Sequence, residues 1–333
     1  MNITIIGDGG WGTAIGLLLN GYGHTVTLWG PFEDALAEIR SKRENVRFLP
    51  GVALPGALIW TADPVRAAAG ADRVVLAVPS RFYQEVGARF AGLIPASTPV
   101  VSLTKGLCEK TRRRMSEIAA EVLALPSVAV LSGPSHAEEV ARGIPTAVVA
   151  AATDAALARE IQVLFNGPRF RVYTSADPLG VELGGAIKNV IAIAVGASDG
   201  LGFGDNTRAA IITRGLAEMT RLGCALGARP ETFAGLSGVG DLIVTCTSRH
   251  SRNHSVGERL GRGESIGAIL ASMQMVAEGV WNAKAVRDAA RACGVDVPIA
   301  EQVCSWCHEG ASPRDSVEAL MSRDMKPEAE EKS

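Results

Sequence analysis

A single lysine stands in an otherwise apolar run of the sequence. Lys188 lies within Gly184–Ile193, whose spacing predicts a helix. A charged amine is costly there unless it is paired or its pKa is lowered, and a lysine of lowered pKa can exchange a proton near neutral pH. We therefore predict that Lys188 is a general acid or base, the alternative being a lysine that reaches solvent at the helix edge. Gly184 and Gly185 each weaken a helix by about 1 kcal/mol relative to alanine, which indicates that something approaches this backbone closely.

Two polar segments further along the chain offer an acid and an anion site. Asp241 ends a glycine-rich turn, where it could orient Lys188, accept a bond from a substrate hydroxyl or cap a helix. The segment Thr247–His254 crowds two arginines, two histidines and several neutral hydrogen-bonding residues into eight positions. Arginine binds phosphate bidentately, and serine and asparagine add hydrogen bonds. We interpret the neighbourhood of Arg252 as a phosphate site, with a solvated polar loop as the alternative.

The first glycines of the chain have the spacing of a dinucleotide-binding loop. Residues 7–12 satisfy G-x-G-x-x-G between a short apolar strand and an apolar helix, which is the context that the motif requires. Gly7 would allow a tight turn, Gly9 the approach of a pyrophosphate, and Gly12 the packing of helix on strand. Free N–H groups at the helix N-terminus would attract the phosphates. Asp8 opposes this interpretation, because a carboxylate repels an anion unless it points away; a glycine-rich turn without a ligand is the alternative.

The choice between NAD and NADP stays open in the sequence. Glu33 lies about 20 residues beyond the loop, where an acid would bind the ribose 2′-hydroxyl of NAD. The proline and phenylalanine before it favour a solvated acid at a helix start instead. The nearby Arg40, Lys42 and Arg43 could meet a 2′-phosphate.

Three further strand ends carry residues that could face a ligand, because ligands of open α/β sheets bind beyond the carboxyl ends of the strands. Pro79 follows one strand and Lys105 another. A lysine so placed can reach a phosphate or a carbonyl, or remain on the surface in a turn. After a third strand, Ser135 is spaced to cap a helix with Glu138 as the capping-box acid. That helix N-terminus could also receive an anion.

The elements that must position these residues are of two kinds. Short β-rich runs alternate with helical stretches in the first half, which predicts a mostly parallel sheet covered by helices. Beyond Asp177-Pro178 we find only helical spacing. We therefore predict a Rossmann-like α/β domain, residues 1–178, followed by an all-helical substrate domain, residues 179–333. The predicted strands are Ile3–Ile6, Thr25–Trp29, Arg73–Val78, Val100–Thr104, Ser127–Leu131, Ala147–Ala150 and Phe170–Tyr173, and the longest predicted helices are Val181–Ala197 and Thr207–Leu226.

Composition excludes several classes of partner. The 333 residues are enough for two domains, and 47% hydrophobic with 20% charged residues is a globular balance. A net charge of −2 offers no basic surface for nucleic acid and no polybasic membrane anchor. The N-terminus lacks the basic region of a signal peptide, and the longest apolar stretch, Val190–Ala197, is too short to span a bilayer. We expect a cytoplasmic protein whose six cysteines are reduced.

The last two cysteines form the run Cys304-Ser-Trp-Cys307-His308, which matches a c-type haem attachment pattern. Such attachment needs an export signal, so we expect small apolar thiols on the buried side of a helix. A redox dithiol or metal pair is the alternative. No cluster has convincing metal-ligand spacing, so we expect no metal. The charged tail Pro327–Ser333 is expected to fray.

Seven segments, in order along the chain, resemble the bacterial NAD(P)-dependent glycerol-3-phosphate dehydrogenase family. They are GDGGWGTA, VLAVPS, SLTKGL, LSGPSHAEEVARG, GGAIKNVIAIAVGASDGLGFGDNTRAA, LSGVGDLIVTCTSRHSRNHSVG and VAEGVWNA. No single segment is decisive, but the ordered set is highly specific. The resemblance implies an enzyme that interconverts dihydroxyacetone phosphate and sn-glycerol 3-phosphate with NAD or NADP, and a biosynthetic role in supplying phospholipid backbones.

The resemblance also implies roles for residues. Lys188 would donate and accept the proton, with Asp241 holding it. The residues assigned to the cofactor are Gly7, Gly9, Gly10, Trp11, Gly12, Pro79, Lys105, Ala137, Arg252, Val276 and Glu278. The residues assigned to the substrate are Lys105, Gly133, Ser135, Lys188, Asn189, Asp241, Ser251, Arg252 and Asn253.

The chain departs from the family's pattern at several positions. Family members often carry alanine and serine in place of Asp8 and Gly10, so a serine hydroxyl to the pyrophosphate is missing. They often carry arginine just after the second strand, where this chain has Gly30, which leaves the NADPH preference open. Trp281 and Asn282 also replace residues that are commonly arginine and threonine.

Two rival functions also stay open. The first is a related dehydrogenase of another hydroxy acid or phosphosugar, and the second is a nucleotide-sensing protein without turnover. A small-molecule substrate is the expected partner, and a homodimer is possible.

Overall fold

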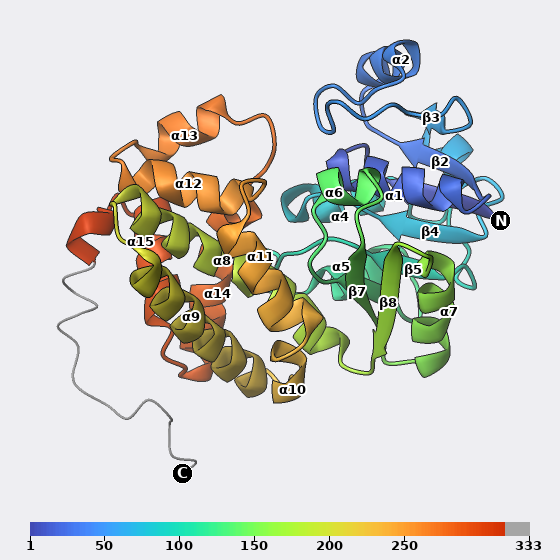
Figure 1. Ribbon diagram of the computed structural model, residues 1–333. Helices are drawn as coiled ribbons and strands as arrows, with labels where there is room; N and C mark the ends of the chain where they lie inside the picture. The colour runs from blue at the N-terminus through green and yellow to red at the C-terminus, as the bar shows by residue number, and fades with distance from the viewer. Residues whose placement is uncertain (317–333) are drawn as a thin grey trace.

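The runs rich in valine and isoleucine form one sheet. Helices cover both faces of this sheet, and strands buried on both faces need apolar side chains at nearly every position. The computed structural model describes residues 1–316 (Figure 1), so the tail Pro327–Ser333 lies outside the described residues. The strand order is β3-β2-β1-β4-β5-β6-β7-β8, and every neighbouring pair is parallel except β6 with β7. The strands are β1 (Asn2–Ile6), β2 (Thr25–Trp29), β3 (Ile59–Thr61), β4 (Arg73–Leu76), β5 (Val100–Ser102), β6 (Ala129–Ser132), β7 (Thr146–Ala151) and β8 (Phe170–Ser175).

The first six strands have the order of a dinucleotide-binding fold, with a switch point between β1 and β4. The seven predicted strands are confirmed. The strand β3 was not predicted, because three residues are too few to show a period.

Helices cover both faces of this sheet and create two apolar cores. Ile15 of α1 and Leu157 of α7 pack on one face, while Tyr83 of α4 and Ile118 of α5 pack on the other. The helices of this domain are α1 (Gly10–Gly21), α2 (Glu33–Lys42), α3 (Pro64–Ala68), η1 (Ser80–Phe82), α4 (Tyr83–Ala88), α5 (Met115–Val122), α6 (Ala137–Ala141) and α7 (Ala155–Phe165).

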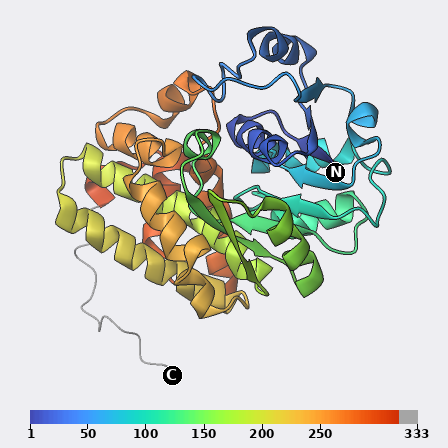
Figure 2. The same cartoon turned by 45° about the vertical axis from the view of Figure 1, so that its right-hand side comes forward.

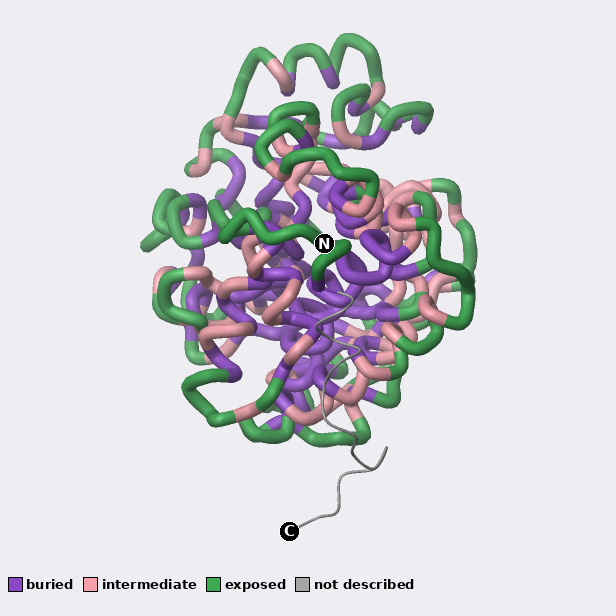
Figure 3. The backbone as a smooth tube through the Cα atoms, turned by 90° about the vertical axis from the view of Figure 1, so that its left-hand side faces the viewer, coloured by how far each residue is buried: buried purple, intermediate pink, exposed green. Residues whose placement is uncertain are grey.

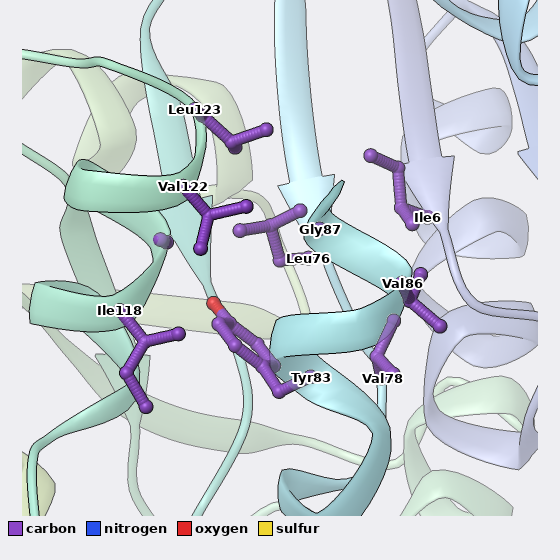
Figure 4. A pocket seen from close by; sticks show the side chains of 10 residues that line it. Ile6, Leu76, Val78, Tyr83, Val86, Gly87, Ile118, Val122 and Leu123 are labelled. Atoms are coloured by element: carbon purple, nitrogen blue, oxygen red, sulfur yellow. The ribbon is translucent and has the colours of Figure 1, made fainter. Parts of the chain in front are cut away.

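A cavity lies between α4, α5 and the sheet (Figure 4), and it belongs to the core. Its volume is about 10 Å³, which is room for one water molecule at most. Its lining is apolar apart from the Tyr83 hydroxyl, which donates to Ser102 Oγ at 2.8 Å. It is therefore not a ligand site.

The second half of the chain folds around one long helix, α8 (Pro178–Gly200), which begins at the residue where we place the domain boundary. Other helices surround α8 (Figures 1 and 2), and the buried backbone gathers in the middle of the molecule (Figure 3). They are α9 (Asp205–Ala225), α10 (Pro230–Phe233), η2 (Leu236–Gly240), α11 (Asp241–Thr247), α12 (Arg252–Gly261), α13 (Ile266–Ser272), α14 (Glu278–Cys293) and α15 (Pro298–His308). No strand follows β8 in the described part of the chain, as predicted. Cys304 and Cys307 are buried on α15, as expected of apolar thiols.

The helix α8 is long and apolar enough to cross a membrane by length and composition. The expectation that no apolar stretch reaches this length is therefore wrong, because the helix begins at Pro178, well before Val190, and continues to Gly200. Its most apolar window is 94% buried inside the helical domain. That burial is typical of the core helix of a globular protein.

Glycines let α12 lie directly against α8. A Cβ atom on Gly196 of α8 would overlap the carbonyl oxygen of His254, and one on Gly257 of α12 would overlap the carbonyl oxygen of Ile193. Each helix thus places a glycine where the other's backbone approaches. This contact fixes the start of α12 beside the middle of α8.

Replacing Gly257 by alanine is expected to lower the free energy of unfolding by about 2–3 kcal/mol, because the new methyl group must push the two backbones apart. Gly267→Ala in α13 is the matched control, since nothing lies within 4 Å of its added Cβ. That control should be neutral or stabilise by up to about 1 kcal/mol. Urea unfolding followed by circular dichroism measures both. Equal stability of the two variants would contradict the close contact.

Candidate active site

Two lysines from different domains share one buried carboxylate. Lys188 Nζ lies 2.5 Å from Asp241 Oδ1, and Lys105 Nζ lies 2.8 Å from Asp241 Oδ2. Lys188 Nζ also donates to Thr245 Oγ1 at 2.8 Å. Only 5% of Lys188 and 1% of Asp241 is exposed, so Lys188 is not a lysine that reaches solvent at the helix edge.

The glycines of α8 allow this cluster to assemble. A Cβ atom on Gly184 would overlap the carbonyl oxygen of Ser237, so the turn before Asp241 can dock only on a glycine. A Cβ atom on Gly185 would lie 3.4 Å from the stem of Lys105. The prediction that something approaches this backbone closely is confirmed.

Burial and the second lysine tune the proton affinity of Lys188. The pKa of Lys188 is lowered from 10.5 to about 7, mainly by burial and also by the Lys105 cation, although Asp241 opposes both effects. Burial alone would raise the pKa of Asp241, but Lys105 and Lys188 hold it below its ordinary value of 3.8. Asp241 therefore stays ionised near neutral pH, and Lys188 can gain or lose a proton there.

Asp241 opens α11, but its side chain does not cap that helix. The N-cap residue is Gly240, and the Asp241 carboxylate accepts hydrogen bonds from Lys105 and Lys188. The sequence left three roles open for Asp241: orienting Lys188, accepting a hydrogen bond from a substrate hydroxyl, or capping a helix. These contacts favour the first role.

Lys105 also connects the cluster to the loop after β6. Its Nζ donates to the Gly133 carbonyl oxygen at 2.8 Å and to Ser135 Oγ at 3.3 Å. The predicted capping box of Ser135 and Glu138 is wrong, because α6 begins after His136 and Ser135 Oγ donates to the Gly133 carbonyl instead. Ser135 thus faces Lys105 and not the helix N-terminus.

The predicted phosphate segment joins two helices: Thr247 ends α11, residues 248–251 form the connecting turn, and Arg252 begins α12. Ser251 caps α12 by accepting a hydrogen bond from His254 N at 3.2 Å. Asn253 Nδ2 donates to Asn189 Oδ1 at 2.9 Å, which ties the start of α12 to the residue after Lys188. The exposed Arg252 donates from Nη1 to the Val276 carbonyl oxygen at 2.7 Å.

The glycine loop has the local geometry that its motif predicts. Gly7 has a φ of +124°, and a Cβ atom on Gly12 would overlap the Gly7 carbonyl oxygen. The space beside Gly9 is open, since nothing lies within 4 Å of its added Cβ. Trp11 Nε1 is buried beside this loop and has no hydrogen-bond partner among the described residues. An open backbone and an unused donor fit a bound dinucleotide.

Gly10 has a structural reason of its own. Its added Cβ would overlap the carbonyl oxygen of Phe48, which covers the start of α1. The serine that family members often carry here would therefore not fit. The backbone at Phe48 occupies the space that its side chain would need. Trp11 and Ala137 pack together with Leu49, so α6 lies beside the glycine loop.

The remaining cofactor candidates lie where the two domains meet. Glu278, which opens α14, accepts hydrogen bonds from the backbone N–H of Ser80, at 2.9 Å, and from its hydroxyl. Pro79 is the residue before this contact. Asn282 Oδ1 accepts from Leu107 N at 3.2 Å, so the departure at position 282 also serves to hold the domains together.

Sequence reasoning missed two polar residues of the site. Thr245 accepts a hydrogen bond from Lys188, and its position four residues after Asp241, on the same face of a helix, was the available signal. His136 has a buried Nε2 without a partner among the described residues. The cations Lys188 and Lys105 add to burial in lowering the pKa of His136, which places this ring in the field of the same cluster.

Family models match nearly the whole chain. The N-terminal model of NAD-dependent glycerol-3-phosphate dehydrogenase matches residues 2–158, and the C-terminal model matches residues 177–318. The chain belongs to the NAD-dependent glycerol-3-phosphate dehydrogenase family. A glycerol-3-phosphate dehydrogenase [NAD(P)+] of Geobacillus kaustophilus is 49% identical over 99% of this chain and 97% of its own length.

Solved structures agree with this membership of the glycerol-3-phosphate dehydrogenase family. The glycerol-3-phosphate dehydrogenase of Coxiella burnetii has a TM-score of 0.93 at 39% identity, covering 97% of this chain and 99% of its own. A D-mandelate dehydrogenase with NADH shares the fold alone, with a TM-score of 0.63 at 15% identity over 96% of this chain and 99% of its own. The architecture by itself therefore does not select a substrate, and the side chains of the site must.

Proposed function

We propose that this chain interconverts dihydroxyacetone phosphate and sn-glycerol 3-phosphate with NAD(H) or NADP(H). The observation that carries the proposal is the buried amine of Lys188, bonded to Asp241 at 2.5 Å and one residue from the contact between Asn189 and Asn253. That contact sets a group able to exchange a proton next to the helix start that carries Arg252. A small ketone with a phosphate at one end needs both.

The cofactor would be held by the glycine loop, Trp11 and the start of α6, with Pro79, Lys105, Arg252, Val276 and Glu278 completing its site. The nicotinamide ring, when bound, supplies the hydride in reduction and accepts it in oxidation. The protein contributes free N–H groups at the start of α1, which stabilise the negative charge of the pyrophosphate.

The proton would be supplied by Lys188. Reduction of the ketone develops negative charge on the carbonyl oxygen, and the protonated amine stabilises that charge and then donates its proton. Asp241 holds the amine in place, and Lys105 keeps the carboxylate ionised. In the reverse direction the neutral amine removes the hydroxyl proton. The water-poor setting strengthens each of these interactions.

The phosphate would be held at the start of α12. Arg252 provides a bidentate cation, while Ser251 and Asn253 offer hydrogen-bonding groups beside it. Gly133 and Ser135, which both accept hydrogen bonds from Lys105, would contact the triose. Holding the phosphate fixes the register of the carbonyl against Lys188.

The biological setting stays a prediction. We propose a role in supplying glycerol phosphate for phospholipid synthesis in the cytoplasm, with a homodimer as the assembly. The family membership supports the metabolic role.

A substrate panel separates this function from its rivals. With NADH and NADPH both supplied, the loss of absorbance at 340 nm should be rapid with dihydroxyacetone phosphate and at least about 100-fold slower with unphosphorylated dihydroxyacetone at equal concentration. Arg252→Ala should remove most of that preference. Equal rates on the two ketones would point to another hydroxy-acid or sugar substrate. Binding of the cofactor without turnover of any ketone would favour a nucleotide sensor.

A further inference from the structure

The side chain of Asp8 points from the glycine loop to the end of the second strand. Gly30 follows β2, and a Cβ atom added to Gly30 would lie 2.5 Å from Oδ2 of Asp8. The carboxylate thus fills the space in which a side chain at position 30 would begin. It lies beyond the carboxyl end of β2, and this orientation removes the expected conflict with a pyrophosphate at the loop.

An acid at this place has a defined use in dinucleotide-binding folds. A carboxylate beyond the end of the second strand accepts a hydrogen bond from the 2′-hydroxyl of the adenosine ribose, whereas a 2′-phosphate needs a basic group there. The candidate suggested by sequence spacing, Glu33, does not supply this acid. It opens α2, is exposed and pairs with Arg40. Asp8 supplies a carboxylate from the neighbouring strand end instead.

Two of the basic residues that could attract a 2′-phosphate already form ion pairs with acids of α2. Arg40 pairs with Glu33 and also donates to the Trp60 carbonyl oxygen, and Lys42 pairs with Glu38 at 2.6 Å.

Two further arginines follow α2. The Arg43 guanidinium lies against Gly56, 3.2 Å from where a Cβ atom there would sit. Arg47 lies over the Phe48 ring, and its charge opposes the rise that burial causes in the pKa of Asp8. Arg47 therefore compensates a carboxylate that has lost part of its hydration, and such a carboxylate gains from a hydroxyl donor.

We propose that Asp8 makes this chain select NAD(H) over NADP(H), by accepting a hydrogen bond from the ribose 2′-hydroxyl and by repelling a 2′-phosphate. This inference rests on the proposed function only in requiring a dinucleotide at the glycine loop. It names Asp8 and Gly30 together as the determinants of cofactor choice.

The test compares the wild-type chain with Asp8→Asn and with Asp34→Asn, an exposed acid of α2 that undergoes the same change of charge. Isothermal titration calorimetry gives the Kd for NADH and for NADPH, and steady-state kinetics with dihydroxyacetone phosphate gives kcat/KM for each. The wild type should favour NADH by about tenfold or more in Kd, and Asp8→Asn should reduce that ratio by about tenfold, mainly through tighter binding of NADPH. Asp34→Asn should keep the wild-type ratio.

A second variant tests the position of the carboxylate and serves if Asp8→Asn does not fold. Gly30→Ala keeps Asp8 but puts a methyl group where its carboxylate lies. The ratio of the Kd for NADPH to the Kd for NADH should therefore fall. Tighter binding of NADPH than of NADH by the wild type, or an unchanged ratio in the variants that fold, would overturn the proposal.

The calorimetric arm separates this inference from the proposed function. If the chain binds NADH more tightly in a way that depends on Asp8 but does not turn over dihydroxyacetone phosphate, the proposed reaction is wrong and the proposed cofactor choice holds. Normal turnover of dihydroxyacetone phosphate, with equal Kd values for NADH and NADPH, would overturn the proposed cofactor choice and leave the proposed reaction in place.

Discussion

Lys188→Ala is expected to lower kcat for the reduction of dihydroxyacetone phosphate by about 10³-fold, because both the proton donor and the cation facing the developing oxyanion are lost. The Kd for the cofactor should stay within about twofold of the wild type, since the contacts proposed for the dinucleotide come mostly from other residues. Stopped-flow kinetics and calorimetry measure the two quantities. Lys284→Ala, which removes a half-exposed lysine of α14 that pairs with Glu109, is the matched control and should keep full activity.

The pH dependence gives the same prediction a second readout. With a pKa of about 7 for Lys188, reduction uses the protonated amine, so its kcat/KM should fall about tenfold per pH unit above neutrality. Oxidation uses the neutral amine, so its kcat/KM should rise up to about pH 7 and then level off. Residual activity of Lys188→Ala should lack this inflection. Turnover equal to that of the wild type would remove Lys188 from the mechanism.

Asp241→Asn is expected to have the second largest effect, because it leaves the buried amine of Lys188 and the partly buried amine of Lys105 without their shared carboxylate. The loss in the free energy of unfolding should be about 3–5 kcal/mol at a pH where both amines are charged. Without the anion the pKa of Lys188 should fall further, so kcat/KM for reduction at pH 7.5 should drop at least about 100-fold. Part of that loss should return as the pH is lowered and Lys188 regains its proton.

Chemical denaturation and pH–rate profiles measure these two effects. Asp205→Asn provides the control, because it removes the same charge from an exposed pair with Arg208 in the same domain. A wild-type pH profile in Asp241→Asn would show that the carboxylate does not control the proton affinity of Lys188. A wild-type stability would show that the two amines do not depend on it.

The local sequence determined much of the sheet domain. The apolar runs of β1, β2, β4 and β5 are each bounded by turn residues. Strands that are buried on both faces need apolar side chains at nearly every position, so they are easy to recognise in the sequence. The glycine motif was equally readable, because a positive φ at Gly7 and a close approach at Gly12 exclude other side chains. Lys188 stood out because an amine in an apolar helix has a cost that must be offset.

Only the tertiary structure decided how these residues combine. The sequence left Asp241 as a helix cap or a partner of Lys188, and nothing local predicted that Lys105, 136 positions away, would share its carboxylate. Local spacing suggested that Ser135 caps a helix, but its hydroxyl accepts a hydrogen bond from Lys105 and donates one to the Gly133 carbonyl. Contacts between residues distant in the chain carry no local period, so they cannot be read from spacing.

Asp8 shows the same division most clearly. The sequence placed a carboxylate in a loop meant for phosphate, which looked like a conflict. The direction of that side chain depends on the absence of a side chain at Gly30, which follows the neighbouring strand β2. Residue types and spacing therefore determined which chemistry this chain can perform, while the packing of distant backbones decided which groups meet, because a side chain's electrostatic environment exists only once the chain has folded.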